Sequence, residues 1–292
     1  MSNPTSSGQE TASAPPLLPP HAATKREIQY LDTIAAYDQW AEVYDTDGNF
    51  LQALDTLEIK ILLPHFLSLI PNPDDDEEEK PSQPRKFIDL GCGTGRNTLA
   101  LLKAAPKARI VGLEPSRKML DVAKARVAQQ QQQQQNVSGA DETMFDVSFE
   151  TYDILQAAAG TSPPPPPALA QGADGAISTL VLEHVPVDAF FRAAAALLKP
   201  RGVLLVTNMH SDMGGISQAG FVHPQTGIKI RPTSYAHTVA EVCAGARTAG
   251  FEVLGDIKEV EVDGEELARV LGPRAKKWIG VRVWFGGCFR KM

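Results

Sequence analysis

Three glycines and one acid are spaced for holding a ligand rather than for packing alone. Residues 86–97 read K-F-I-D-L-G-C-G-T-G-R-N, in which Asp89 stands two positions before Gly91, and Gly93 and Gly95 follow at every second position. Glycine lets the backbone turn sharply and approach a ligand, because no Cβ stands in the way. A short apolar strand before this loop and a helix after it would aim the unpartnered N–H groups of the first helical turn at the same place. The stretch therefore predicts a cofactor cradle.

The spacing of the glycines distinguishes two kinds of cofactor. A dinucleotide fingerprint has the pattern G-x-G-x-x-G, with its acidic residue only after the next strand. Here the pattern is G-x-G-x-G and Asp89 precedes it. This argues against an NAD(P)-dependent oxidoreductase, which would use the same kind of sheet. The string D-L-G-C-G-T-G instead resembles motif I of the class I S-adenosylmethionine (SAM) methyltransferases.

The resemblance implies a set of cofactor-binding residues. In this family the acid that closes the second strand holds both ribose hydroxyls, and Glu114 stands at that position; a carboxylate suits two O–H donors. Met119 matches an apolar residue that lies against the adenine ring, and Asp153 matches an acid that accepts from the adenine amino group. The full expected set is Tyr37, Tyr44, Asp89, Gly91, Cys92, Gly93, Thr94, Gly95, Asn97, Glu114, Met119, Asp153 and Thr179.

Candidates for a general base stand where two further strands should end. Glu183 and His184 follow an apolar run at residues 175–181, and His210 follows another at residues 203–207. Open α/β sheets carry their ligands at the carboxyl ends of the strands. Imidazole titrates near neutral pH, which suits proton transfer. His184, Glu183 and His210 are therefore the predicted catalytic residues, with a structural role for Glu183 or His184 as the alternative.

Seven apolar strands alternating with helices should position these residues. The strands are expected at residues 87–90, 108–113, 144–151, 175–181, 203–207, 251–262 and 281–289. This alternation predicts one α/β domain built on a doubly wound, seven-stranded, Rossmann-like sheet. The last two strands are joined by a connection shorter than the others, which fits the reversed last strand of the class I methyltransferase sheet. The resemblance covers roughly residues 30–289.

The remaining segments have compositions of their own. Residues 1–27 are predicted to be a disordered tail, and the methyltransferase domain to span residues 28–292. Residues 28–70 should form N-terminal lid helices. Their aromatic side chains should either close over the cofactor or pack the helix onto the core. Surface insertions are expected near residues 71–84, 129–140 and 160–172, which are acidic, Gln-rich and Pro-rich in turn.

The charge and the cysteine content of the chain indicate which binding partners and which cellular compartment to expect. The net charge of -7 includes a run of six acids, so the rest of the chain is nearly balanced, and neither nucleic acid nor a membrane is expected as a partner. The three cysteines lie far apart, so we expect no metal site, no disulfide framework, and a reducing, cytoplasmic location. A monomer or homodimer acting on a small-molecule substrate fits these features.

Further motifs refine the resemblance. L-E-H-V at residues 182–185 and S-Q-A-G-F at residues 217–221 look most like small-molecule methyltransferases of fungal specialised (secondary) metabolism. The implied activity is transfer of a methyl group from SAM to an O, N or S nucleophile of a small molecule. A SAM-binding protein that does not methylate, pericyclase-like or regulatory, would carry the same cradle and stays open as an alternative.

Overall fold

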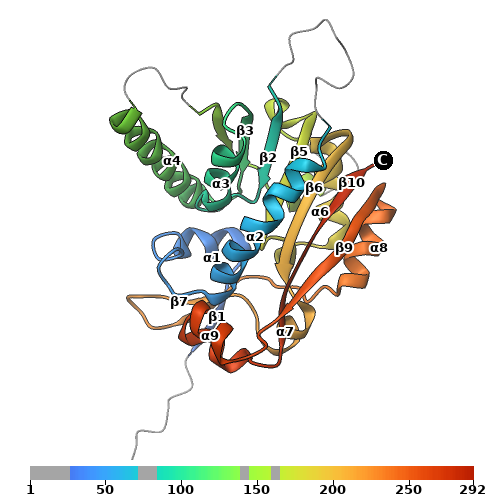
Figure 1. Cartoon of the computed structure of the whole chain (residues 1–292). Coiled ribbons are helices and arrows are strands. Elements are labelled where there is room, and N and C mark those ends of the chain that lie inside the picture. The colour runs from blue at the N-terminus through green and yellow to red at the C-terminus, as the bar shows by residue number, and fades with distance from the viewer. Residues whose placement is uncertain (1–26, 72–83, 139–144, 159–164) are drawn as a thin grey trace, which may run out of the picture.

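A seven-stranded sheet forms the centre of the molecule (Figure 1). The computed structural model describes residues 27–71, 84–138, 145–158 and 165–292. The strand order is β4-β3-β2-β5-β6-β10-β9, in which the first five are parallel and β10 is antiparallel to both of its neighbours. The strands are β2 (Lys86–Leu90), β3 (Arg109–Leu113), β4 (Val147–Glu150), β5 (Ala173–Thr179), β6 (Leu198–Met209), β9 (Phe251–Glu261) and β10 (Arg282–Lys291). The predicted doubly wound sheet with a reversed last strand is confirmed.

Helices bury both faces of this sheet, which is why its parallel strands are continuously apolar. On one face, side chains of α2 and α3 pack with strand residues such as Phe87 and Ile110. On the other face, α6 and α8 enclose a second cluster that contains Phe190 and Phe191. The helices are α2 (Phe50–Ser68), α3 (Arg96–Ala104), α5 (Ile154–Ala158), α6 (Val187–Leu197), α8 (Val239–Thr248) and α9 (Glu265–Leu271). None of the helices that the structure describes has the length and apolarity to cross a bilayer.

The N-terminal segment begins as a strand, not as the predicted helix. β1 (Ile28–Tyr30) pairs in parallel with β8 (Lys229–Arg231), which pairs antiparallel with β7 (Phe221–Val222). β7 and β8 thus form a hairpin, and its edge supplies the backbone partners that draw β1 out of a helix. Helix α1 (Thr33–Trp40) begins only where the Asp32 side chain accepts a hydrogen bond from the Ala35 N–H, at 3.0 Å. Tyr44 therefore lies in the turn after α1 instead of on its face.

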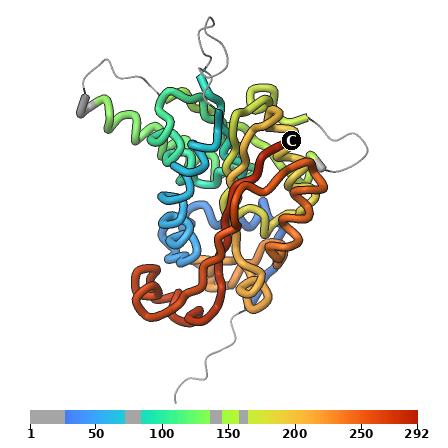
Figure 2. Tube along the Cα trace, turned by 45° about the vertical axis from the view of Figure 1, so that its right-hand side comes forward, coloured from blue at the N-terminus to red at the C-terminus, as the bar shows by residue number. Residues whose placement is uncertain are grey.

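Two other segments differ from the predictions. Helix α4 (Arg117–Ser138) continues through the Gln run, which the sequence indicates as a surface insertion, because Gln is a good helix former. Its C-terminal part projects from the body in both views (Figures 1 and 2). A short helix not predicted from the sequence, α7 (Ser211–Ile216), follows β6 directly. The predicted tail and most of the acidic linker lie outside the described residues, as does part of the Pro-rich insertion.

Candidate functional site

A cavity of about 270 Å³ opens at the carboxyl ends of the parallel strands. Its walls come from the glycine loop after β2, the ends of β3 and β4, the short 3₁₀ helix η3 (Leu182–His184) after β5, and the start of α1. We call it the cofactor cavity. Its lining contains the predicted cofactor residues Tyr37, Tyr44, Gly91, Gly93, Glu114, Asp153 and Thr179, together with the predicted base His184.

The glycine loop is shaped for close approach by a ligand. Gly91 and Gly93 both have positive φ, at 74° and 52°, which favours glycine at both positions. A Cβ on Gly91 would lie 2.3 Å from Cγ2 of Val181, so the loop packs tightly on the chain behind it. A Cβ on Gly93 would meet no protein atom within 4 Å. Because Gly93 lines the cavity, a side chain there would occupy space that belongs to the ligand.

Glu114 stands beside this loop with spare hydrogen-bonding capacity. One carboxylate oxygen accepts from the Gly93 N–H at 3.1 Å and the other from the Ser116 N–H at 3.0 Å. Each oxygen can accept a second hydrogen bond, so the carboxylate can hold two hydroxyl groups. Burial raises the pKa of Glu114 to about 7. The Glu114 carboxylate can accept from two hydroxyl groups and lies next to an open glycine loop. This arrangement fits the ribose and the methionine chain of SAM, the cofactor that the sequence resemblance implies.

Several predicted cofactor residues lie behind the cavity wall and shape it from there. Asp89 is buried, accepts from the Thr98 hydroxyl at 2.6 Å, and has its pKa raised by that burial to about 6. Asn97 donates to the Thr179 hydroxyl at 2.6 Å. Met119 is fully buried beneath α1 in a cluster with Trp40. Cys92, Thr94 and Gly95 belong to the loop but do not line the cavity.

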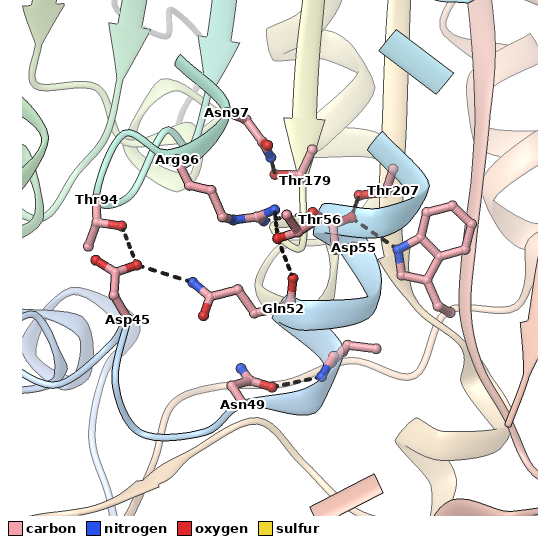
Figure 3. Close-up of polar contacts among 12 residues, drawn as sticks. Asp45, Asn49, Gln52, Asp55, Thr56, Thr94, Arg96, Asn97, Thr179 and Thr207 are labelled. Carbon is pink, nitrogen blue, oxygen red and sulfur yellow. Dashed lines mark hydrogen bonds and ion pairs between the residues drawn. The ribbon is translucent and has the colours of Figure 1, made fainter. Parts of the chain in front are cut away.

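Two acids from the N-terminal segment brace the loop from outside, and the sequence pattern did not indicate them. Asp55 on α2 is fully buried and accepts from Arg96 at 2.6 Å, from the Thr207 hydroxyl at 2.5 Å and from the Trp284 indole N–H at 3.0 Å (Figure 3). It therefore ties α2 to α3, β6 and β10. Asp45 accepts from the Thr94 hydroxyl at 3.0 Å and pairs with Arg126.

His184 is held as a neutral imidazole at the cavity wall. Its Nδ1 lies 2.7 Å from the Thr233 carbonyl oxygen, which can only accept, so Nδ1 carries the proton. Its Nε2 then accepts from the Tyr37 hydroxyl, also at 2.7 Å. Burial lowers the pKa of His184 to about 4. The histidine thus holds α1 over the cofactor cavity through the Tyr37 hydroxyl.

A second attachment fixes the same helix to the start of α4. The Asp38 carboxylate accepts from the Ser116 hydroxyl at 2.6 Å and from the Lys118 backbone N–H at 3.3 Å. An acid at a helix N-terminus satisfies orphan N–H groups and suits the positive end of the helix dipole. Helix α1 is therefore held in place at both Tyr37 and Asp38.

Glu183 faces a second, smaller cavity of about 90 Å³. We call it the second cavity. Tyr37, Tyr44 and Leu180 line both cavities and form the wall between them. Leu180 keeps an unusual positive φ of 56°, and its N–H donates to the Thr207 carbonyl at 2.9 Å, which fixes that conformation. One oxygen of Glu183 is buried without a partner, and burial raises the pKa of its carboxyl to about 7.

His210 lies outside both cavities. Its Nδ1 accepts from the Asp212 backbone N–H at 3.0 Å and so caps α7, while its Nε2 lies 3.1 Å from a carboxylate oxygen of Glu259. Both ring nitrogens are therefore engaged by neighbouring elements. The structure places this predicted catalytic residue in a structural network, because the chain turns into α7 immediately after β6.

Other lining residues were not predicted. Pro115 and Tyr152 line the cofactor cavity next to the predicted acids, so their position after β3 and β4 could have indicated them. Gln218 and Trp278 line the second cavity and come from segments far along the chain. No spacing in the sequence connects those two with the glycine loop.

Comparisons with known proteins agree on one family. The family model described as a methyltransferase domain matches residues 88–204. An uncharacterised methyltransferase of Emericella nidulans is 52% identical over 268 residues, which cover 89% of this chain and 91% of that protein. A SAM-dependent methyltransferase structure from Mesorhizobium loti has a TM-score of 0.50 at 18% identity, covering 78% of this chain and 96% of its own. A methyltransferase structure from Haloferax volcanii, in complex with the activator Trm112, has a TM-score of 0.51 at 18% identity, covering 86% and 96%.

Proposed function

This chain belongs to the methyltransferase family, with SAM as the expected methyl donor, and we propose that it methylates an O, N or S atom of a small molecule. The observation that carries the proposal is the wall of Tyr37, Tyr44 and Leu180, on whose two sides lie the cofactor cavity and the second cavity. A methyl donor on one side and an acceptor on the other would meet at this wall. The second cavity is small and combines aromatic and other apolar side chains with polar ones such as Glu183 and Gln218, which suits a small molecule.

The methyl group of SAM is already activated, so the protein has to align the donor with the acceptor and enclose both. When bound, SAM would supply a methyl carbon on a positively charged sulfur. The acceptor atom would form a bond to this carbon as the carbon–sulfur bond breaks and its electron pair returns to sulfur. Any proton on the acceptor atom would then pass to a base or to water. Alignment of two reactants can supply on the order of 7 kcal/mol of the barrier. Glu114 and the Gly93 backbone hold the cofactor, and Tyr37 and Tyr44 exclude water above it.

Two groups are placed to hold a proton near the wall. Glu183 presents an unpartnered carboxylate oxygen in the second cavity, and at neutral pH its raised pKa leaves part of the population able to accept a proton. The Tyr37 hydroxyl donates a hydrogen bond to Nε2 of His184, which is the second group. The pKa of about 4 makes His184 a weak base, so Glu183 is the better acceptor of a proton from the substrate.

The proposal extends to specialised metabolism and to the cytoplasm. The E. nidulans relative, a fungal protein, supports the first part together with the motifs at residues 182–185 and 217–221. Cys92, Cys243 and Cys288 are all unpaired, which supports a reducing compartment. Identification of the acceptor by its co-purification or by a metabolite profile of a deletion strain would test the first part.

A titration and an assay test the activity itself. Calorimetry should show binding of SAM and of S-adenosylhomocysteine, and no comparable binding of NADH. Incubation with SAM and a small-molecule extract should then release S-adenosylhomocysteine. Tight NADH binding without SAM binding would overturn the cofactor assignment. SAM binding with no S-adenosylhomocysteine release from any extract fraction would favour a protein that binds SAM without methylating.

A further inference from the structure

The second cavity gathers most of the unsatisfied polar atoms of the described residues. Among the described residues, four buried side-chain polar atoms lack a hydrogen-bond partner, and three of the four belong to residues that line this cavity. They are Oε2 of Glu183, Oε1 of Gln218 and Nε1 of Trp278. Native proteins pair nearly all such atoms, so three in one small cavity indicate a molecule that binds there.

The unpaired polar groups of Glu183 and Trp278 come from two separate elements of the lining, η3 and η4 (Pro273–Trp278), which we call its two ends. Glu183 follows Leu180 closely in the chain, and Leu180 belongs to the wall shared with the cofactor cavity. The other end is built by the 3₁₀ helix η4, which follows α9 and contacts the N-terminal half of the fold at α2. In Figures 1 and 2 the segment from α9 onward lies beside the start of α2. No residue of η4 lines the cofactor cavity.

The end formed by η4 offers donors and positive charge. Trp278 is buried and its indole N–H has no partner. The Lys277 ammonium lies 5.0 Å from the centroid of the Trp278 ring and, within the described chain, has no carboxylate partner. Arg274 also lines this end, donates to the Asp47 carbonyl at 2.8 Å and lies 3.7 Å from the Asp47 carboxylate, so its charge is partly compensated. The Lys277 ammonium and the Trp278 N–H, with the remaining N–H groups of Arg274, suit a carboxylate, which accepts several hydrogen bonds.

At the end near the wall, the ligand must supply a hydrogen-bond donor instead of an acceptor. The free oxygen of ionised Glu183 accepts a hydrogen bond and has no donor in the protein. A hydroxyl or amine of the ligand would supply that hydrogen and would stand next to the wall. Between the two ends the sides are apolar and aromatic, with Phe50, Met209 and Met213 among them. Phe50 stacks on Trp278 with ring centroids 6.1 Å apart, so this side is flat.

We propose that the methyl acceptor is a small hydroxy- or amino-carboxylic acid with an apolar body, whose carboxylate lies against Lys277, Arg274 and Trp278 and whose hydroxyl or amine faces Glu183. The proposal rests on the function proposed above and specifies its substrate class. On methylation at that hydroxyl or amine, the acceptor atom gains the methyl carbon and its proton passes to the Glu183 carboxylate. The acid group at the other end is unchanged.

Binding of matched pairs of probes tests the charge requirement. The probes are 4-hydroxybenzoate, salicylate, anthranilate and mandelate, each with its primary amide, titrated into the protein saturated with S-adenosylhomocysteine. At least one acid should bind, and its amide should bind at least about tenfold more weakly because the charge is gone while the shape is kept. Binding of an amide within threefold of its acid, or of no acid at all, would overturn the proposal. S-adenosylhomocysteine binding is measured first, so a failure of the proposed function is seen separately.

Two neighbouring lysines provide a matched control. Lys277→Met should weaken binding of the acid at least about fivefold and leave its amide unchanged. Lys276→Met should leave both unchanged, since its ammonium lies 3.5 Å from Glu265 and the residue does not line the second cavity. Equal effects of the two substitutions would overturn the assignment of Lys277.

Glu183→Gln tests the other end. With the bound acid as substrate, the variant should lose at least about tenfold in methyl transfer. It should keep its affinity for S-adenosylhomocysteine, because Glu183 does not line the cofactor cavity. Unchanged turnover would remove Glu183 from the acceptor site and overturn that half of the proposal.

Discussion

The cofactor cavity and the second cavity share a wall but differ in whether the protein supplies hydrogen-bond partners for their polar groups. In the first, the Glu114 carboxylate is already held by two backbone N–H groups and adds a ligand through its remaining lone pairs. In the second, Glu183, Gln218 and Trp278 each bury an atom that the protein leaves unpaired. Unpaired buried polar groups lower the stability of the folded protein, so a ligand that supplies the missing hydrogen bonds gains affinity. We therefore expect the first cavity to recognise its ligand by preformed shape, and the second by supplying hydrogen bonds that the protein leaves unmade.

Blocking the preformed shape should have the largest effect. Gly93→Ala puts a methyl group into the space next to Glu114 and should weaken S-adenosylhomocysteine binding about 100-fold by calorimetry. Gly255→Ala is the control, since Gly255 also has positive φ, at 71°, and open space at its Cβ, but lies on β9 away from both cavities. If both variants bound the cofactor equally well, the glycine loop would not be the cradle.

Removing a charge from the second cavity should stabilise the protein. Burial raises the pKa of Glu183 to about 7 from an ordinary value of about 4.5. The folded protein therefore loses stability as the pH rises from the lower value through the higher one, because the carboxyl must then ionise while buried. Glu183→Gln removes this loss. At about pH 8 the variant should unfold with a free energy on the order of 2 kcal/mol greater than the wild type, and the gap should close towards about pH 4.5.

Denaturant unfolding at several pH values measures this effect. Glu266→Gln, at an exposed position on α9, is the control and should show no such dependence. A Glu183→Gln protein that is less stable than the wild type at every pH would mean that the carboxyl already has partners in the folded chain.

The Tyr37–His184 pair tests whether the wall itself takes part in catalysis. His184→Ala should lower kcat at least about tenfold, or roughly 1.4 kcal/mol, and leave SAM affinity within a few-fold. Tyr37→Phe removes only the hydroxyl and should reproduce the loss if the two act as a unit. Because the pKa of His184 is about 4, its titration should not shape the rate near neutral pH. A rate limb near neutral pH that disappears in His184→Ala would contradict this neutral, fastened histidine.

The smallest effect is expected from a segment that belongs to neither cavity. Deleting residues 129–135 removes two turns from α4 and keeps the remaining residues in phase, since seven residues make roughly two turns. The melting temperature should change by less than about 2 °C, and ligand binding should be unaffected. A drop of more than about 5 °C in calorimetry would show that this end of α4 packs on the body.

The features that could be predicted are those carried by neighbouring residues. The glycine loop and the acid closing β3 are local patterns, and each is found where expected. What could not be predicted depends on contacts between distant segments. β1 becomes a strand only because β8, some two hundred residues later, offers it an edge. The second cavity combines Phe50, Glu183 and Trp278, whose meeting is set by the topology of the whole chain and by no spacing between them.

The shared wall has a consequence for reaction kinetics. Tyr37 comes from α1 and Tyr44 from the turn after it, so the acceptor side is complete only when α1 lies closed, held by His184 and Ser116. The start of the same helix also lines the cofactor cavity. We therefore expect an ordered reaction, with the donor binding first and the acceptor second. Steady-state inhibition by S-adenosylhomocysteine should accordingly be competitive towards SAM and noncompetitive towards the acceptor, and the demethylated cofactor should be the last product to leave.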